Sequence, residues 1–177
     1  MDERKVVCYI ATSLDGYIAD VEETLDWLLH VEMDGDGGYG AFIETVDAVV
    51  LGRRTYEWVM DYENDNFPYV DQQSYVVTSR PEASKGRLTF TSEDPANLVK
   101  RLKQQAGNTI WPVGGSLLLD RLLQEDLVDE FIISVAPVTL GDGIPLFQKT
   151  QRRLDFTLES VTKHGQMAQM HYKRHRT

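Results

Sequence analysis

Two adjacent arginines stand alone in an acidic half of this sequence. Between positions 5 and 80 the chain holds fifteen acidic residues, and Arg53 and Arg54 are its only basic ones. Gly52 precedes them and Thr55, a hydroxyl donor, follows, where we expect a helix to begin. A helix start disfavours cations by about 0.3–1 kcal/mol each, so an anion that docks there would explain the pair. The alternative is that both arginines point outward and pair with surrounding carboxylates, which contributes little at a surface.

A glycine pair between two apolar segments is a second candidate for anion binding. Gly114 and Gly115 separate a short apolar run at 110–113 from a leucine-rich segment of helical spacing at 117–123. Without Cβ atoms, another molecule can approach their backbone, and the positive helix end behind them favours an anion such as a pyrophosphate. The alternative is a tight turn whose glycines only supply positive φ, and these residues leave both interpretations open.

A third group of donors follows another expected strand. Thr78, Ser79 and Arg80 offer two hydroxyls and a guanidinium at a strand end, where ligands of open α/β sheets gather. Arginine can give paired donors to a phosphate monoester. The alternative is an ordinary polar exit from a strand that ends before Pro81. Taken together, the three segments match a dinucleotide with an extra phosphate, because they supply two donor groups for its pyrophosphate and one for its 2′-phosphate.

Two aspartates are candidates for an acid that protonates a substrate. Asp26 lies in a short, otherwise apolar helical segment, where burial would raise its pKa toward a proton-donating range. Equally, a first-turn aspartate can face water and stabilise its helix. Asp15 is the other candidate, although an Asp-Gly pair in a loop more often forms a turn. The four histidines have no ligand spacing, so we expect no metal site.

The composition limits the classes of partner. A formal net charge of −10 argues against binding to nucleic acid or to an anionic membrane, since both need a basic face. No apolar run approaches the ~18 residues of a membrane span, and no signal segment opens the chain. The single cysteine, Cys8, suits a reducing compartment. We therefore expect a cytoplasmic protein that acts on a small molecule.

Strands that alternate with helices must position these groups. The pattern predicts one α/β domain over residues 1–177. The helix after Asp94 has the strongest boundary signals, with Pro95 in its first turn and Gly107 beyond its end. We expect strands at 6–11, 47–51, 74–78, 88–91, 110–113 and 130–138, followed by two long strands around a turn at 164–166.

Five motifs, in this order, resemble the dihydrofolate reductase-like superfamily, and in particular the C-terminal reductase domain of RibD and its stand-alone relatives. The resemblance implies a three-layer fold with a mixed, mostly parallel central sheet of about eight strands, flanking helices and a C-terminal antiparallel hairpin. It also implies NADPH as the hydride donor, and a homodimer. The motifs are Ile10–Ala19, Val50–Glu57, Val113–Ser116, Leu127–Glu130 and Leu140–Phe147.

The same resemblance assigns cofactor positions. Ala11 and Ile18 match backbone positions that hold the nicotinamide carboxamide. One helix start matches the positions that bind the pyrophosphate and the 2′-phosphate. A strand end matches the positions that bind the adenosine phosphate. The glycine pair and its neighbours match a second pyrophosphate-binding helix. The residues at these three places are Gly52, Arg53, Arg54 and Thr55; Thr78, Ser79 and Arg80; and Val113, Gly114, Gly115, Ser116 and Leu117.

Three positions depart from the patterns of the enzymes resembled. Val113 replaces an acidic residue, Tyr17 replaces a basic residue suited to a phosphorylated substrate, and Leu118 replaces the aromatic residue of dihydrofolate reductases. We expect an NADPH-dependent reductase of a pyrimidine- or pterin-like heterocycle, resembling 5-amino-6-(5-phosphoribosylamino)uracil reductase of riboflavin biosynthesis. The alternative is a non-catalytic NADP(H)-binding or sensing module that kept the cofactor cleft.

Overall fold

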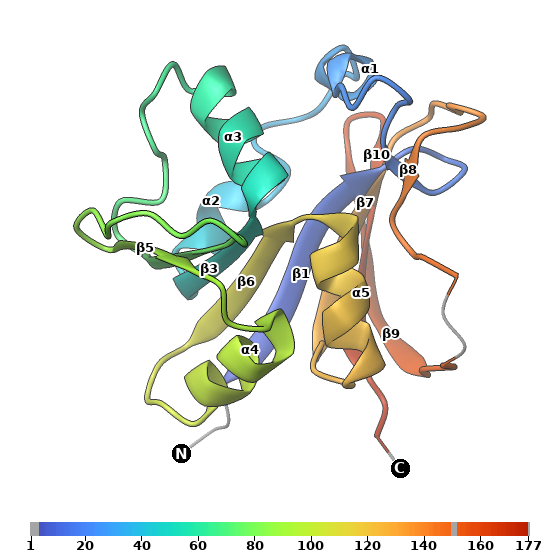
Figure 1. Cartoon of the computed structure of the whole chain (residues 1–177). Coiled ribbons are helices and arrows are strands. Elements are labelled where there is room, and N and C mark those ends of the chain that lie inside the picture. The colour runs from blue at the N-terminus through green and yellow to red at the C-terminus, as the bar shows by residue number, and fades with distance from the viewer. Residues whose placement is uncertain (1–3, 150–151, 177) are drawn as a thin grey trace.

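Eight strands form the central sheet of this protein, described by a computed structural model that covers residues 4–149 and 152–176. The strands are β1 (Lys5–Thr12), β3 (Val46–Gly52), β4 (Gln73–Val77), β5 (Leu88–Thr91), β6 (Thr109–Gly114), β7 (Glu130–Val135), β9 (Phe156–His164) and β10 (Met167–Arg174). Their order is β5-β4-β3-β6-β1-β7-β10-β9 (Figure 1). All pairs from β5 to β7 are parallel, whereas β10 pairs antiparallel with β7 and β9. The expected mixed sheet with a C-terminal hairpin is therefore confirmed.

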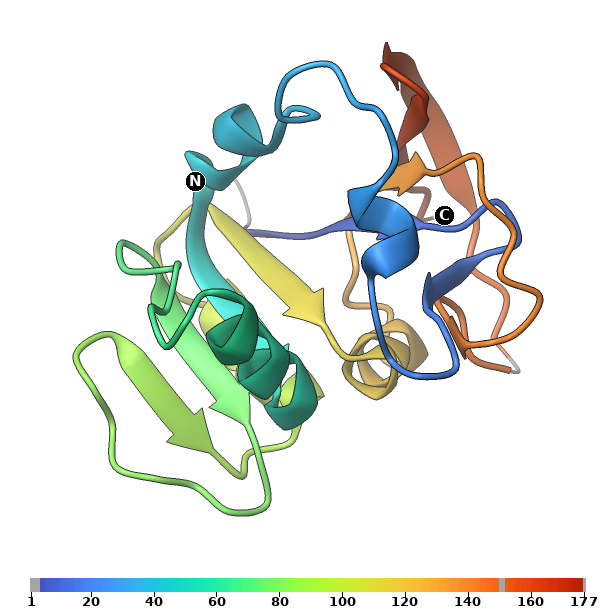
Figure 2. The same ribbon diagram turned by 90° about the horizontal axis from the view of Figure 1, so that it is seen from above.

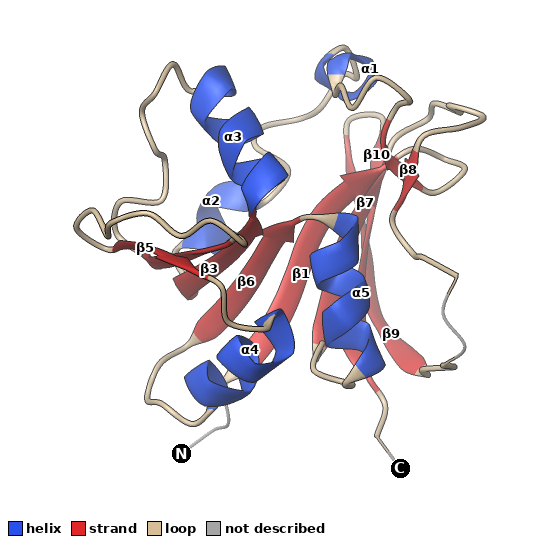
Figure 3. Ribbon diagram, viewed as in Figure 1, coloured by secondary structure: helices blue, strands red, loops and turns tan. Residues whose placement is uncertain are grey.

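Helices cover both faces of this sheet and complete the three layers. They are α1 (Asp26–Leu29), α2 (Tyr39–Ile43), α3 (Arg53–Tyr62), α4 (Pro95–Lys103) and α5 (Ser116–Gln124). One core packs Leu98 and Leu122, from α4 and α5, on one face of the sheet. The other packs Phe42 and Val59, from α2 and α3, on the opposite face (Figure 3). A small second sheet pairs β2 (Tyr17–Ala19) with β8 (Ile144–Pro145).

Local sequence signals explain where several elements begin and end. The Asp94 carboxylate caps α4 by accepting hydrogen bonds from the amides of Ala96 and Asn97, as its boundary signals predict. β7 ends at Val135 rather than at the expected position 138, because Pro137 has no amide hydrogen to extend a ladder. Within the described part of the chain, none of the helices combines the length and apolar character that crossing a membrane requires.

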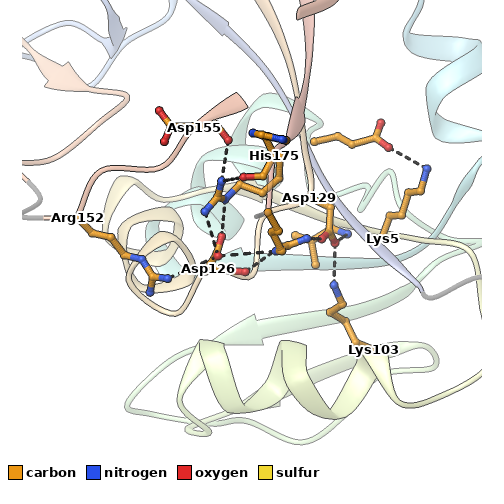
Figure 4. Close-up of polar contacts among 11 residues, drawn as sticks. Lys5, Lys103, Asp126, Asp129, Arg152, Asp155 and His175 are labelled. Atoms are coloured by element: carbon orange, nitrogen blue, oxygen red, sulfur yellow. Dashed lines mark hydrogen bonds and ion pairs between the residues drawn. The ribbon is translucent and has the colours of Figure 1, made fainter. Parts of the chain in front are cut away.

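A cluster of ion pairs and hydrogen bonds joins α4 and the C-terminal segment to the amino ends of β1 and β7 (Figure 4). The Asp129 carboxylate accepts hydrogen bonds from the Val6 amide at 2.8 Å, from Lys103 at 2.8 Å and from Arg176 at 2.7 Å. Asp126 accepts two more from Arg174, at 2.7 and 3.1 Å. This cluster stabilises the end of the sheet opposite to the strand ends at which the sequence places the candidate site.

Candidate functional site

The sheet opens between β1 and β6 toward their carboxyl ends. Backbone pairing joins Lys5 to Thr109 and Val6 to Ile110, at the amino ends of the two strands. Beyond these pairs the strands diverge (Figure 2). Pro112, in β6, has no amide hydrogen with which to continue a ladder. The sequence analysis does not predict this opening, although a proline inside an expected central strand is a signal for it.

A narrow apolar pocket lies in this opening. It is lined by Cys8, Ile10, Ile18, Pro112, Gly114 and Leu118, among others. Burial raises the pKa of the Cys8 thiol to about 12, so this thiol stays protonated and unreactive at neutral pH. Leu118 is buried here, which makes the position of the expected aromatic residue part of an aliphatic wall.

Main chain forms the rim of the pocket where β3 and β6 end. Leu51 is in register with Gly114, so the turns that follow these neighbouring strands meet. A Cβ atom at Gly114 would stand 3.2 Å from the Cγ2 atom of Thr55, tighter than ordinary packing. Gly115 has a φ of 107° and would bring a Cβ within 3.9 Å of the Gly52 Cα atom. The positive φ of Gly115 and the close approach of Thr55 to Gly114 therefore favour glycine at both positions, and the rim is formed by backbone.

Two helices begin at this rim without side-chain caps. Gly52 is the N-cap of α3 and Gly115 is the N-cap of α5, and neither helix start has a capping side chain. α4 differs, since Asp94 fills that role there. The first-turn amides of α3 and α5 are therefore left as donors for a ligand, and both helix dipoles place positive charge there.

Arg53 lies at this helix start with its guanidinium already paired. Its Nε donates to Glu57 at 2.7 Å, and its Nη1 donates to Glu82 at 2.6 Å. The guanidinium also lies over the rings of Tyr56 and Phe90, at 5.9 and 5.8 Å from their centroids. The two carboxylates raise the pKa of Arg53 above its ordinary value, so the side chain stays charged. Neither acidic partner was identified from the sequence.

Arg54 adopts the arrangement that the sequence offered as the alternative to an anion site. Its side chain is 85% exposed and pairs with Glu23 at 2.8 Å. Glu23 belongs to the connection between β2 and α1, so this ion pair joins that connection to the start of α3. As an exposed pair it contributes little to stability.

The predicted donors after β4 lie beside the start of α3. Gly52 is in register with Val77, which places Thr78 next to the turn that carries Arg53. Thr78 is buried, and its hydroxyl accepts a hydrogen bond from the Arg80 amide at 3.2 Å. Ser79 and Arg80 are exposed. Among residues 4–149 and 152–176, no carboxylate forms an ion pair with Arg80, so its guanidinium is available to a ligand.

The remaining predicted cofactor positions differ in their surroundings, and Ser116 lines the pocket. Ala11 lies on β1, half-buried and in register with Ser134 of β7. Val113 and Ser116 are half-buried on either side of the glycine pair. Leu117 is 76% exposed in the first turn of α5, so the expectation that it shares the buried apolar face of that helix is wrong.

Asp15 holds two loops together. Its carboxylate accepts hydrogen bonds from the Ser13 hydroxyl at 2.6 Å and from the amides of Leu140 and Gly141 at 3.0 and 2.8 Å. The Ser13 hydroxyl and these amides lower the pKa of Asp15 to about 2. A group with that pKa is ionised at neutral pH and cannot donate a proton there, so its role is that of the turn former.

Asp26 is exposed, so of the two alternatives that the sequence left open, the aspartate that faces water is the one found. α1 is a single turn of four residues, and none of them is fully buried. An apolar neighbourhood in the sequence therefore does not enclose this carboxylate, because the short helix packs its apolar side chains only partly.

The glycine-rich segment between α1 and α2 contains a Gly-x-Gly-x-x-Gly spacing, at 35–40. It does not follow a strand, which the dinucleotide-binding fingerprint requires. Instead, the Asp36 carboxylate accepts hydrogen bonds from the amides of Gly38 and Gly40, and the Gly37 carbonyl accepts one from the Tyr9 hydroxyl. These contacts give the segment a structural role.

Residues 4–170 match the family model of the RibD C-terminal domain. The chain is also 45% identical over 173 residues to YwjB of Bacillus subtilis strain 168, a protein without an assigned activity. That match covers 97% of this chain and 99% of YwjB.

Solved structures share the fold over nearly the whole chain. A protein of Shewanella sp. PV-4, provisionally named a riboflavin biosynthesis protein, is 31% identical with a TM-score of 0.86, covering 97% of this chain and 99% of that one. Dihydrofolate reductase from Enterococcus faecalis, solved in complex with NADP(H), is 18% identical with a TM-score of 0.62, covering 97% of each chain. At that identity the second likeness shows the fold alone.

Proposed function

The chain belongs to the RibD C-terminal domain family and has a reductase-type fold, and we propose that it is an NADPH-dependent reductase of a small nitrogen heterocycle. One observation carries the proposal. Two uncapped helix starts and a glycine-lined rim converge beside an opening in the sheet. This arrangement offers backbone donors to a pyrophosphate and an apolar slot to a flat ring.

The residues present fit such a cofactor. A Cβ at Gly114 would press on the Thr55 side chain, and Gly115 has a φ of 107°, so glycines leave the backbone of this pair without side chains beside the start of α3. The backbone amides of Gly52–Thr55 and Val113–Leu117 would hold the pyrophosphate. The Arg53 side chain, together with Thr78–Arg80 at the neighbouring strand end, would hold the 2′-phosphate. Ala11 and Ile18 would orient the nicotinamide through their backbone groups. When bound, the cofactor supplies a hydride, while the protein supplies position and field.

The environments of the two aspartates favour water as the source of the proton. Asp15 has a pKa of about 2 and is tied to loop amides, and Asp26 is exposed. The Asp15 carboxylate is therefore ionised at neutral pH, and the Asp26 side chain faces water. The substrate would lie between β1, the α1 segment and the loop at 141–147. A pyrimidine- or pterin-like ring would pack there against the apolar side chains that line the β1–β6 opening, among them Ile10, Ile18 and Leu118.

Cofactor oxidation with candidate substrates tests this proposal. The purified chain is incubated with NADPH and a panel of pyrimidines, pterins and small carbonyl compounds, and the absorbance of the reduced cofactor is followed. We expect oxidation that depends on one heterocycle class and on enzyme concentration. Tight binding of NADPH without oxidation by any compound would support the non-catalytic module instead, and absence of NADPH binding would contradict both.

A further inference from the structure

Two carboxylates contact the single positive charge of the Arg53 guanidinium, so the group as a whole has a negative charge. Glu57 and Glu82 both contact it, at 2.7 and 2.6 Å, so one cation faces two anions. The three side chains are 30%, 55% and 45% exposed, which places the group at the protein surface within reach of a ligand. An incoming phosphate at this point meets a net negative charge.

The two acidic partners reach Arg53 from different elements. Glu57 lies one turn further along α3, four residues from Arg53, and therefore stays beside it in the helix. Glu82 lies 29 residues from Arg53, in the exposed connection between β4 and β5 that also carries Arg80. The Tyr56 and Phe90 rings support the guanidinium independently of either carboxylate. Glu82 is thus the partner that can leave without disturbing the helix.

On the premise of the proposed NADPH site, we infer that Glu82 is a specificity-determining residue: its carboxylate occupies the Nη1 donor of Arg53 that a 2′-phosphate would take. A nucleotide with this phosphate must displace Glu82 and then lies close to its charge. A nucleotide without it leaves the ion pair intact. Glu82 therefore reduces the preference for phosphorylated over unphosphorylated adenine nucleotides, which Arg80 and Arg53 create.

Calorimetric titration with two small nucleotides tests this competition. The probes are adenosine 2′,5′-bisphosphate and AMP, which differ only in the 2′-phosphate. Glu82→Gln keeps the size of the side chain and removes its charge. We expect the dissociation constant of the bisphosphate to fall about five- to tenfold, the effect of one like charge at contact distance. The dissociation constant of AMP should change less than about twofold, because AMP lacks the 2′-phosphate that competes with Glu82 for the Arg53 Nη1 donor, and its 5′-phosphate meets the backbone amides of the helix start.

Two further variants make the interpretation specific. Glu159→Gln removes a carboxylate that pairs with Lys173 at 3.0 Å on the hairpin of β9 and β10, at the opposite edge of the sheet from β5 and β4, and should leave both dissociation constants unchanged. In an Arg53→Ala background, Glu82→Gln should tighten bisphosphate binding less than it does in the native chain, since the shared donor is gone. The difference between the two backgrounds measures the coupling between Glu82 and Arg53.

The outcomes separate this inference from the proposed function. If the native chain binds the bisphosphate and Glu82→Gln leaves its affinity unchanged or weaker, the competition is overturned while the cofactor site stands. If Glu82→Gln tightens AMP and the bisphosphate equally, the role in specificity is likewise overturned. If neither the native chain nor Glu82→Gln binds either nucleotide, the proposed cofactor site is contradicted, and the inference about Glu82 is contradicted with it.

Discussion

Gly114 of β6 lies against Thr55 of α3, so closely that a Cβ at position 114 would be 3.2 Å from Thr55 Cγ2 and 3.3 Å from its Oγ1. This contact joins the two turns that follow neighbouring parallel strands. It sets how near the start of α3 comes to the glycine pair before α5. The width of the proposed pyrophosphate site therefore depends on the absence of a side chain at position 114.

Gly114→Ala should push the first turn of α3 away by a few tenths of an ångström. We expect a loss of about 1 kcal/mol in the free energy of unfolding and about tenfold weaker NADPH binding, because the amide donors no longer converge. Urea denaturation and calorimetric titration measure the two effects. Thr55→Ser in the same chain removes the nearest methyl group and should restore part of both losses. Unchanged binding by Gly114→Ala would contradict the proposed rim.

Asp15→Asn should destabilise the protein in a pH-dependent way. The pKa of Asp15 is lowered from 3.8 to about 2 in the folded chain, so the unfolded chain binds more protons between these values. The stabilisation by the carboxylate is therefore present above about pH 4 and is lost as the pH falls toward 2. Thermal denaturation should show a lower melting temperature for Asp15→Asn than for the native chain above about pH 4, and this difference should disappear as the pH falls toward 2. Asp142→Asn, in the same loop region, is the control and should show no such trend.

Asp129→Asn should lower the free energy of unfolding by about 2 kcal/mol, because the carboxylate accepts three hydrogen bonds from charged and backbone donors. Its side chain is 13% exposed, so water replaces these partners poorly. Asp155→Asn, which disturbs an exposed pair with Arg153, should cost less than about 0.5 kcal/mol. Urea denaturation compares the two. Nucleotide binding should survive in both variants, because neither residue lies at the carboxyl end of the sheet.

Much of the fold could be predicted because its strands are apolar runs. Val49, Val50 and Leu51 are fully buried between helices on the two faces of the sheet, which is what a continuous apolar segment indicates. Asp94 and Pro95 marked the start of α4 through chemistry contained in a few neighbouring residues. Local signals of this kind need no knowledge of the rest of the chain.

The features that the sequence does not predict depend on contacts between residues far apart in the chain. Arg53 meets Glu82 only because β4 and β5 pack beside α3, and 29 residues separate the two side chains. The opening of the sheet lies between β1 and β6, and the sequence alone does not show that these two strands are neighbours. The exposure of Asp26, which the sequence left open, depends on how the single turn of α1 packs, since none of its residues is fully buried.

The central claim is that the carboxyl ends of β3, β4 and β6 together bind a nicotinamide nucleotide with a 2′-phosphate. Calorimetric titration of the native chain and of Arg80→Ala with NADPH and NADH tests it most directly, since Arg80 has a guanidinium free of ion pairs with the described residues. We predict tighter binding of NADPH than of NADH by the native chain, and a loss of about tenfold in NADPH affinity alone on substitution. Equal affinities for the two nucleotides in the native chain, or an NADPH affinity unchanged by Arg80→Ala, would contradict the claim.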